Sequence, residues 1–249
     1  MNVLVLGGTA EARRLAELLT GTAEARVVVS LAGHTTDATP LPCPVRIGGF
    51  GGAEGLAAHL CATSVDVLVD ATHPFAATMP VNATRAAHIV GIPYLRLVRP
   101  PWERQPGDRW IDAADLHDAR RRLIEHGARR VLLTTGRRDL APFASLPDIH
   151  FVVRSIEDPD PMPLVAATLI RARGPFDAPA EAKLLRDHNI DTVVTKNAGG
   201  PGAKLVAARR AGIVVVMVPR PAIPSGARVT TAAEALSWLN YNPTMRQAQ

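Results

Sequence analysis

Residues 2–13, NVLVLGGTAEAR, join an apolar run to a helical pattern through two glycines. The run from Val3 to Leu6 contains β-branched residues and has no helical period, which is typical of a buried strand in a parallel sheet. After Gly7 and Gly8, apolar residues recur at the spacing of an amphipathic helix. This stretch therefore predicts a strand, a tight turn and a helix, the repeating unit of an α/β fold.

The turn has the features of a phosphate-binding site. Gly7 and Gly8 let the backbone approach a ligand closely, Thr9 adds a hydroxyl, and the first N–H groups of the helix lie at the positive end of its dipole. The usual dinucleotide fingerprint has small residues at offsets zero, two and five, and here Gly7, Thr9 and Ala12 occupy them. We expect Gly7, Gly8 and Thr9 to bind a pyrophosphate, with Arg13 nearby. A tight turn without a ligand is the alternative.

The second predicted strand, residues 26–30, indicates which nucleotide is bound. An NAD enzyme places an Asp or Glu at this point to bind the ribose 2′-hydroxyl. Here the strand ends in Ser30, and Gly33 and His34 follow. The missing carboxylate and the available donors favour NADP, with Ser30 and Gly33 near the 2′-phosphate, although an ordinary glycine-containing loop would read the same way.

A further buried strand, residues 65–70, leads into the sequence Asp70-Ala-Thr-His-Pro-Phe75. Ligands of open α/β sheets bind at the carboxyl ends of the strands, so these side chains lie at the functional edge. We expect Asp70, Ala71 and Thr72 to contact the cofactor. His73 fits a ligand contact and a hydrogen-bonded structural histidine equally well.

Consecutive prolines in Arg99-Pro-Pro-Trp102 mark a domain boundary, after which strand and helix patterns alternate again. We predict two Rossmann-like lobes, residues 1–98 and 99–249, each a mainly parallel sheet with flanking helices, with an intervening cleft. Two helices are expected around residues 174–176, and the residues after Trp238 resemble a frayed tail.

The second predicted lobe repeats the logic of the first. A buried strand ends at Lys196, and paired glycines, Gly199 and Gly200, precede the next helix. Another strand ends close to Arg137. Strand ends in such a sheet lie at its ligand-binding edge, so we expect Lys196, Arg137 and the glycine pair to lie at that edge.

Composition limits the classes of partner. The chain has 249 residues, of which 47% are hydrophobic, and 28 Lys and Arg against 23 Asp and Glu give a net charge of +5. This Arg-rich excess fits nucleic acid or a polyanionic small molecule, and the lack of a basic run with interleaved aromatics favours the small molecule. Without an apolar run of membrane length or a targeting segment, we expect a cytoplasmic protein that binds neither membranes nor nucleic acid. The histidines and two cysteines show no metal-ligand spacing.

Several motifs together resemble the precorrin-6A reductase family of corrin-ring biosynthesis, in the right order from residue 2 to about residue 221. They are Gly7-Gly-Thr-Ala-Glu-Ala-Arg13, Gly48-Gly-Phe-Gly-Gly52, Asp70-Ala-Thr-His-Pro-Phe-Ala76, Arg99-Pro-Pro-Trp102, Gly174-Pro-Phe176 and Lys196-Asn-Ala-Gly-Gly200. The resemblance implies an NADPH-dependent reductase of cobalamin biosynthesis that delivers a hydride at the C18–C19 bond of a ring-contracted tetrapyrrole with many carboxylates.

The resemblance also implies roles for residues of both lobes. Lys196, Gly199, Gly200 and Arg137 would hold the substrate, and the proton would come from His73, from Lys196 or from water. We expect a monomer, or transient contacts with neighbouring enzymes of the pathway. A different NADP-dependent reductase or epimerase is one alternative, although no Tyr-x-x-x-Lys pair is present. A non-catalytic dinucleotide-binding protein is another.

Overall fold

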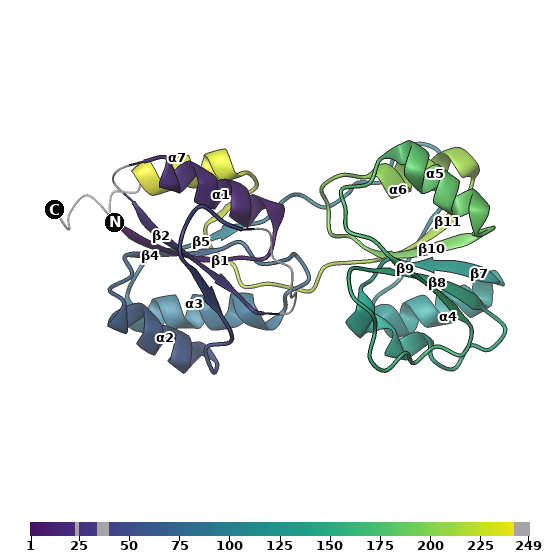
Figure 1. The fold of residues 1–249 in the computed structure, drawn as a ribbon, viewed down its shortest axis with the longest axis horizontal. Helices are drawn as coiled ribbons and strands as arrows, with labels where there is room; N and C mark the ends of the chain where they lie inside the picture. Colours follow the sequence, from purple (N-terminus) through teal and green to yellow (C-terminus); the bar gives the residue numbers. More distant parts are fainter. Residues whose placement is uncertain (23–24, 34–39, 242–249) are drawn as a thin grey trace. The chain divides into compact units, whose positions relative to one another are not determined.

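The computed structural model describes residues 1–22, 25–33 and 40–241, and the chain forms two compact units (Figure 1). The first unit comprises Met1–Pro100 together with the chain from Pro221 onward, and the second comprises Pro101–Arg220. Each unit contains one six-stranded sheet in which all strand pairs are parallel. The predicted α/β class with two parallel-sheet lobes is therefore confirmed.

The sheet of the first unit has the strand order β12-β5-β4-β1-β2-β3, the order of dinucleotide-binding folds with β12 in the sixth place. Its strands are β1 (Asn2–Leu6), β2 (Arg26–Leu31), β3 (Val45–Ile47), β4 (Val67–Asp70), β5 (Tyr94–Leu97) and β12 (Arg228–Val229). Its helices are α1 (Ala10–Thr20), α2 (Ala53–Ala62), α3 (Thr78–Val90) and α7 (Ala232–Tyr241).

The sheet of the second unit has the corresponding order, β9-β8-β7-β10-β11-β6. Its strands are β6 (Trp110–Asp112), β7 (Arg130–Leu133), β8 (His150–Ser155), β9 (Ala167–Arg171), β10 (Thr192–Lys196) and β11 (Val214–Val218). Its helices are α4 (Leu116–His126), α5 (Ala178–Asp187) and α6 (Ala203–Ala211), with short 3₁₀ turns η1 (Arg137–Asp139) and η2 (Ala141–Phe143).

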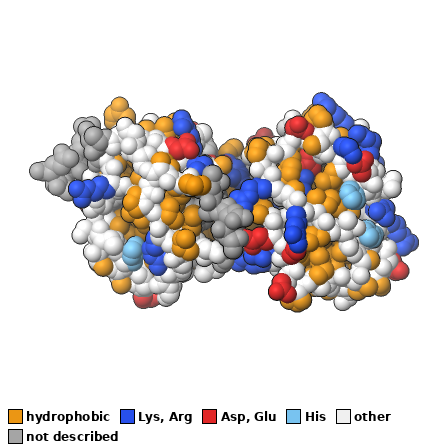
Figure 2. Space-filling view, viewed as in Figure 1, with side chains coloured by type: hydrophobic (Ala, Val, Ile, Leu, Met, Phe, Trp, Pro, Cys, Tyr) orange, Lys and Arg blue, Asp and Glu red, His pale blue; other side chains and the backbone are white. Residues whose placement is uncertain are grey.

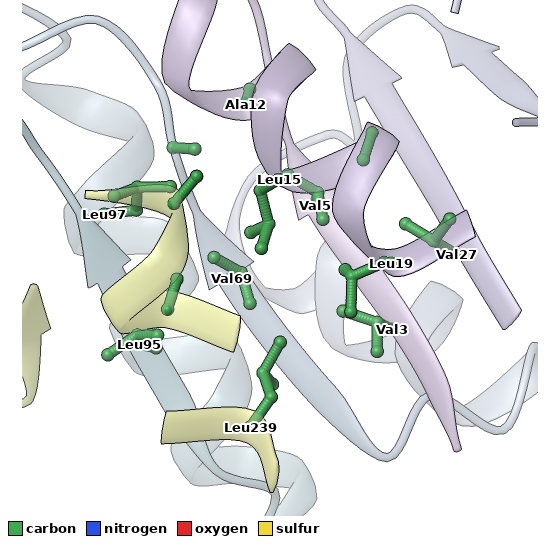
Figure 3. Packing of buried hydrophobic residues seen from close by; sticks show 14 of the residues in the cluster. Val3, Val5, Ala12, Leu15, Leu19, Val27, Val69, Leu95, Leu97 and Leu239 are labelled. Atoms are coloured by element: carbon green, nitrogen blue, oxygen red, sulfur yellow. The ribbon is translucent and has the colours of Figure 1, made fainter. Parts of the chain in front are cut away.

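Helices cover both faces of each sheet (Figure 1). In the first unit α1 and α7 pack on one face and α2 and α3 on the other, each pair with its own apolar cluster. Figure 3 shows Leu15 of α1 and Leu239 of α7 directed at the same side of the sheet as Val5 and Val69. Strands buried on both faces explain the continuous apolar runs from which the sequence predicted them.

The chain after Arg220 departs from the prediction. Residues 99–249 were expected to form one lobe, but β12 pairs with β5 and α7 packs on α1 in the first unit. The expected frayed tail after Trp238 is also wrong at its start, since Leu239 belongs to the core of the first unit and is 2% exposed. An apolar helix face packs on a part of a sheet that other helices have not covered. The position of the helix in the sequence does not reveal which sheet that is.

Two helices were expected around residues 174–176, but the segment before Gly174 forms the edge strand β9 and only α5 follows. Among the described residues, no helix has the length and apolar character needed to cross a bilayer. The predicted cleft between the lobes stays a prediction.

Candidate functional site

The first candidate site lies where β1 and β4 are neighbours and the chain leaves the sheet in opposite directions. Ligands of open parallel sheets bind at this switch point, outside the carboxyl ends of the strands. Gly7 and Thr9 follow β1, Ala71 and Thr72 follow β4, and Ser30 lies in the neighbouring β2. The structure therefore brings together the strand ends that the sequence predicted for the cofactor.

Gly7 and Gly8 are needed for different reasons. A methyl group on Gly7 would lie 2.7 Å from Cγ1 of Val29, so this position is restricted by packing under α1. Gly8 has φ +111°, a conformation that other residues rarely adopt, and apart from its two chain neighbours no described residue has an atom within 4 Å of where its Cβ would be. The open space at Gly8 is the cradle that a ligand approaching the backbone requires.

Thr9 ties this turn to the end of β4. Its hydroxyl accepts a hydrogen bond from the N–H of Ala12, 3.1 Å away, and donates one to the carbonyl of Ala71, 2.8 Å away. Glu11 places a carboxylate in the first turn of α1, where it would repel a phosphate, but it pairs with Arg99 at 2.9 Å. The helix terminus therefore remains suited to an anion.

Asp70 is fully buried at the end of β4 and makes four contacts with the protein. One oxygen accepts hydrogen bonds from the N–H of Thr72 at 3.0 Å and from its hydroxyl at 2.6 Å. The other accepts from the hydroxyl of Tyr94 at 3.1 Å and forms an ion pair with Arg96 on β5. Protein groups contact both oxygens of Asp70, and its predicted contact with the cofactor stays a prediction.

The environment of Tyr94 keeps its phenol neutral. Burial raises its pKa, and the negative charge of Asp70 raises it further. The neutral phenol donates its hydrogen bond to Asp70. This network fixes the backbone from which the Thr72 and His73 side chains project.

His73 lies exposed on the loop after β4. Its Nδ1 accepts a hydrogen bond from the N–H of Phe75 at 3.3 Å, which assigns the proton of the neutral ring to Nε2. The loop therefore directs an exposed imidazole that can donate through Nε2.

The predicted 2′-phosphate residues lie beside β3. Ser30 is 6% exposed, and its hydroxyl lies 3.4 Å from a guanidinium nitrogen of Arg46. Gly33 has φ +76°, and a Cβ there would lie 3.0 Å from Ile47, so a glycine is required. Arg13 donates to the carbonyl of Pro40 at 2.7 Å. His34 lies outside the described residues.

In the second unit, the corresponding switch point lies between β7 and β10. Lys196, the last residue of β10, forms an ion pair with Asp139 of η1. Arg137 pairs with Glu157 at 2.6 Å and also donates to the carbonyl of Asp158 at 3.2 Å. Two of the predicted substrate residues thus lie at this edge, each with a carboxylate partner.

The loop that carries Gly199 and Gly200 is held on both sides. Trp102 donates its backbone N–H to Oδ1 of Asn197 at 2.7 Å and its indole N–H to the carbonyl of Gly200 at 2.8 Å. Arg220 donates to the carbonyl of Asn197 at 2.9 Å. Gly199 and Gly200 both have positive φ, +70° and +80°, so the loop turns sharply at a fixed position.

Sequence reasoning missed the residues that support these two edges. Arg96 and Tyr94 hold Asp70, Arg46 lies beside Ser30, and Asp139 holds Lys196. All four come from neighbouring strands or turns, which only the sheet order brings close. The sequence nevertheless contained a signal for Arg96, because a charged residue stands out within a strand of otherwise buried, largely apolar residues.

The basic excess is distributed among acidic groups. On the face in view, blue Lys and Arg side chains of the second unit stand beside red Asp and Glu side chains in several places (Figure 2). The ion pairs of the second unit include Arg171 with Asp158 and Lys183 with Asp187. The face resembles a mixed surface rather than a continuous basic stripe.

Comparison with known proteins gives concordant results. Residues 2–240 match the family described as precorrin-6x reductase CbiJ/CobK. The precorrin-6A reductase of Rhodococcus erythropolis is 47% identical over 96% of this chain and 97% of its own length. That of Rhodobacter capsulatus is 42% identical over 96% of this chain and 95% of its own length. A solved CobK precorrin-6A reductase superposes with a TM-score of 0.91 at 41% identity, and the match covers 96% of each chain.

Proposed function

The chain belongs to the precorrin-6x reductase CbiJ/CobK family, and from this premise we propose that its first unit binds NADPH and its second unit binds the carboxylates of the tetrapyrrole. Its reaction is the reduction of precorrin-6A, an oxidoreduction of cobalamin biosynthesis. The residue roles below, the C18–C19 position of the hydride, the cytoplasmic location, and a monomeric state or transient contacts with neighbouring enzymes of the pathway are our predictions.

The groups at the end of β1 fit a dinucleotide. The open space at Gly8, the hydroxyl of Thr9 and the N-terminus of α1 supply the donors and the close backbone approach that a pyrophosphate needs. The pairing of Glu11 with Arg99 offsets the carboxylate nearest to that position. We assign the pyrophosphate to Gly7, Gly8 and Thr9. Arg13 can add a positive charge on the same helix.

When bound, NADPH supplies the hydride. Thr72 and His73 then lie on the loop next to the cofactor turn, because the hydroxyl of Thr9 binds the carbonyl of Ala71. Asp70 acts as a positioning residue that holds this loop through the backbone and side chain of Thr72. Of the two side chains predicted as proton donors, His73 carries its proton on the exposed Nε2, whereas Lys196 is paired with Asp139.

In the second unit, we assign a substrate carboxylate to Lys196 and to the turn of Gly199 and Gly200. The clamp formed by Trp102 and Arg220 keeps that turn in place without the ligand, which lowers the entropy lost on binding. Arg137 would join by exchanging its bond to Glu157 for a bond to the substrate, since guanidinium groups bind carboxylates in pairs of hydrogen bonds.

The observation that carries the cofactor assignment is the open, positive-φ turn at Gly8, and its test is a charge at that position. Gly8→Asp places a carboxylate against the phosphates, whereas Gly8→Asn adds nearly the same volume without charge. We expect NADPH to bind at least tenfold more weakly to Gly8→Asp than to Gly8→Asn, measured by fluorescence titration. Equal affinities for NADPH in the two variants would remove the first glycine turn from the site.

The second unit is tested by Lys196→Ala. We expect this variant to raise KM for precorrin-6A or to lower kcat at least tenfold, followed by the loss of NADPH absorbance, while the Kd for NADPH changes less than twofold. Lys183→Ala is the matched control, because the Lys183 side chain on α5 of the same unit is 69% exposed and pairs with Asp187. Wild-type kinetics for Lys196→Ala would show that Lys196 is not part of the substrate site.

A further inference from the structure

Arg46 lies next to the predicted 2′-phosphate residue, in a strand that the sequence analysis did not identify. It is the central residue of β3, and it pairs in register with Ser30 of β2. Registered residues of parallel neighbouring strands share a face of the sheet. The guanidinium of Arg46 therefore reaches the hydroxyl of Ser30, with 3.4 Å between Nη1 and Oγ.

Neutral groups hold Arg46 in place. Its two terminal nitrogens donate to the carbonyls of Gly48 at 2.6 Å and Gly49 at 2.7 Å, and its guanidinium lies 3.8 Å from the centre of the Phe50 ring. The glycine-rich segment 48–52 thus wraps around the side chain. An arginine fixed in this way loses little conformational entropy when an anion binds to it.

No Asp or Glu forms an ion pair with Arg46 within the described part of the chain, unlike several other arginines of the first unit. Arg14, Arg85, Arg96 and Arg99 of the same unit all form ion pairs with Asp or Glu. The positive charge of Arg46 affects the nearby His59, whose pKa is lowered first by burial and then by that charge. The end of β2 therefore carries an uncompensated cation.

We propose that Arg46, together with the hydroxyl of Ser30, binds the ribose 2′-phosphate and makes the enzyme prefer NADPH to NADH. This inference rests on the proposed function, in which the first unit binds NADPH. The end of β2 is where dinucleotide-binding folds contact the ribose, and a nearby arginine accommodates the additional phosphate of NADP. A guanidinium and a hydroxyl donate charge-assisted hydrogen bonds that a ribose without the phosphate does not receive.

A purely structural role for Arg46 has a different consequence. If Arg46 only holds the carbonyls of Gly48 and Gly49, its loss disturbs the segment and weakens NADPH and NADH alike. If it binds the 2′-phosphate, its loss weakens NADPH alone. The ratio of the two dissociation constants therefore separates the roles.

The experiment measures the Kd of NADPH and of NADH by fluorescence titration for the wild-type chain, Arg46→Gln and Arg46→Lys. Glutamine can still donate to one carbonyl but carries no charge, and lysine restores the charge. Arg85→Gln is the matched control, since Arg85 lies in the same unit and its side chain is 66% exposed. Calorimetry with 2′,5′-ADP and with 5′-ADP isolates the phosphate from the nicotinamide.

We expect Arg46→Gln to bind NADPH about 10 to 100 times more weakly and NADH within twofold of wild type, and Ser30→Ala to show a smaller loss in the same direction. Arg46→Lys should recover part of the preference, and raised salt should weaken NADPH binding more in wild type than in Arg46→Gln. A retained NADPH preference in Arg46→Gln, or equal losses for both cofactors, would overturn the assignment. A wild-type chain without any preference for NADPH would instead refute the proposed cofactor, and this inference with it.

Discussion

The two units share one strand order and differ in the side chains at its switch point. At the end of β1, Gly8 is open and Thr9 caps a helix, so backbone donors are exposed to a ligand. At the end of β10, Lys196 supplies a charged side chain that pairs with Asp139. The order of the strands therefore fixes where a ligand binds, whereas the residues after each strand decide which chemical groups are recognised.

Each unit contains a buried ion pair between a carboxylate and an arginine, and the two pairs differ in the hydrogen bonds that the carboxylate accepts. Asp70 and Arg96 in the first unit have side chains 0% and 4% exposed, and Glu181 and Arg154 in the second have side chains 2% and 8% exposed. Both oxygens of Asp70 are hydrogen-bonded, whereas Oε2 of Glu181 has no partner in the described part of the chain. Phe176 lies 4.0 Å from the guanidinium of Arg154. Only the first pair is built into a polar network next to a candidate site.

The largest expected effect comes from breaking these pairs one at a time. Arg96→Met leaves Asp70 buried without its cation, which we expect to lower the free energy of unfolding by about 3–5 kcal/mol. Hydrogen exchange should increase in peptides of the first unit only. Arg154→Met should give the mirror result, confined to peptides of the second unit. Loss of protection in both units from either variant would contradict the prediction that each ion pair stabilises only its own unit.

The next effect tests the assignment of the C-terminal helix to the first unit. Leu239→Ala removes a side chain that is 2% exposed among residues of α1, β4 and β5, and should lower the free energy of unfolding by about 2–5 kcal/mol. Denaturation followed by hydrogen exchange should place the loss in the first unit. The exposed Tyr241→Ala is the matched control and should change stability by less than about 0.5 kcal/mol. An equally small effect of Leu239→Ala would mean that α7 does not contribute to the core.

A smaller effect is expected when Asp70 loses one hydrogen bond, which leaves it with fewer partners, as Glu181 has. Tyr94→Phe deletes one hydrogen bond to a charged group and keeps the ring, so we expect the free energy of unfolding to fall by about 1.5–3 kcal/mol. The Kd for NADPH should rise at the same time if the network positions Thr72. Thr63→Val, which deletes an exposed hydroxyl bonded to the carbonyl of His59 in the same unit, serves as the control. An unchanged Kd for NADPH in Tyr94→Phe would separate the network from the site.

The smallest effect concerns the start of one helix in each unit, where a carboxylate accepts hydrogen bonds from the backbone. In the first unit Glu234 accepts hydrogen bonds from the N–H of Thr230 and of Thr231, and in the second Asp118 accepts one from the N–H of Ala114. These donors lower the pKa of both carboxyl groups. A depressed folded-state pKa contributes stability above the unfolded value that is lost as the pH falls through the folded value.

Carboxyl-carbon NMR titration should therefore find Glu234 below its ordinary pKa of 4.5 and Asp118 below 3.8. Both helices should lose stability only as the pH falls below these values. A pKa at or above the ordinary value for either group would mean that the backbone hydrogen bond is absent.

Most of the fold follows from local sequence patterns, and the strands that were not predicted have a property in common. Strands β1, β4, β7 and β10 lie in the interior of their sheets and were predicted from the sequence. Strands β3, β6 and β12 have two or three residues each and were missed. Short edge strands are buried on one side at most, so they carry too little periodicity to be recognised.

The sequence by itself determined the α/β class, the glycine turn between the first strand and the first helix, and the resemblance to one reductase family. These depend on residues that are close in the chain, where conformational preference and hydrophobic period act directly. Only the tertiary structure decided that α7 completes the first core, that Arg96 holds Asp70, and that Arg46 lies beside Ser30. Such contacts arise when strands far apart in the chain become neighbours, and no local pattern encodes which strands will pair.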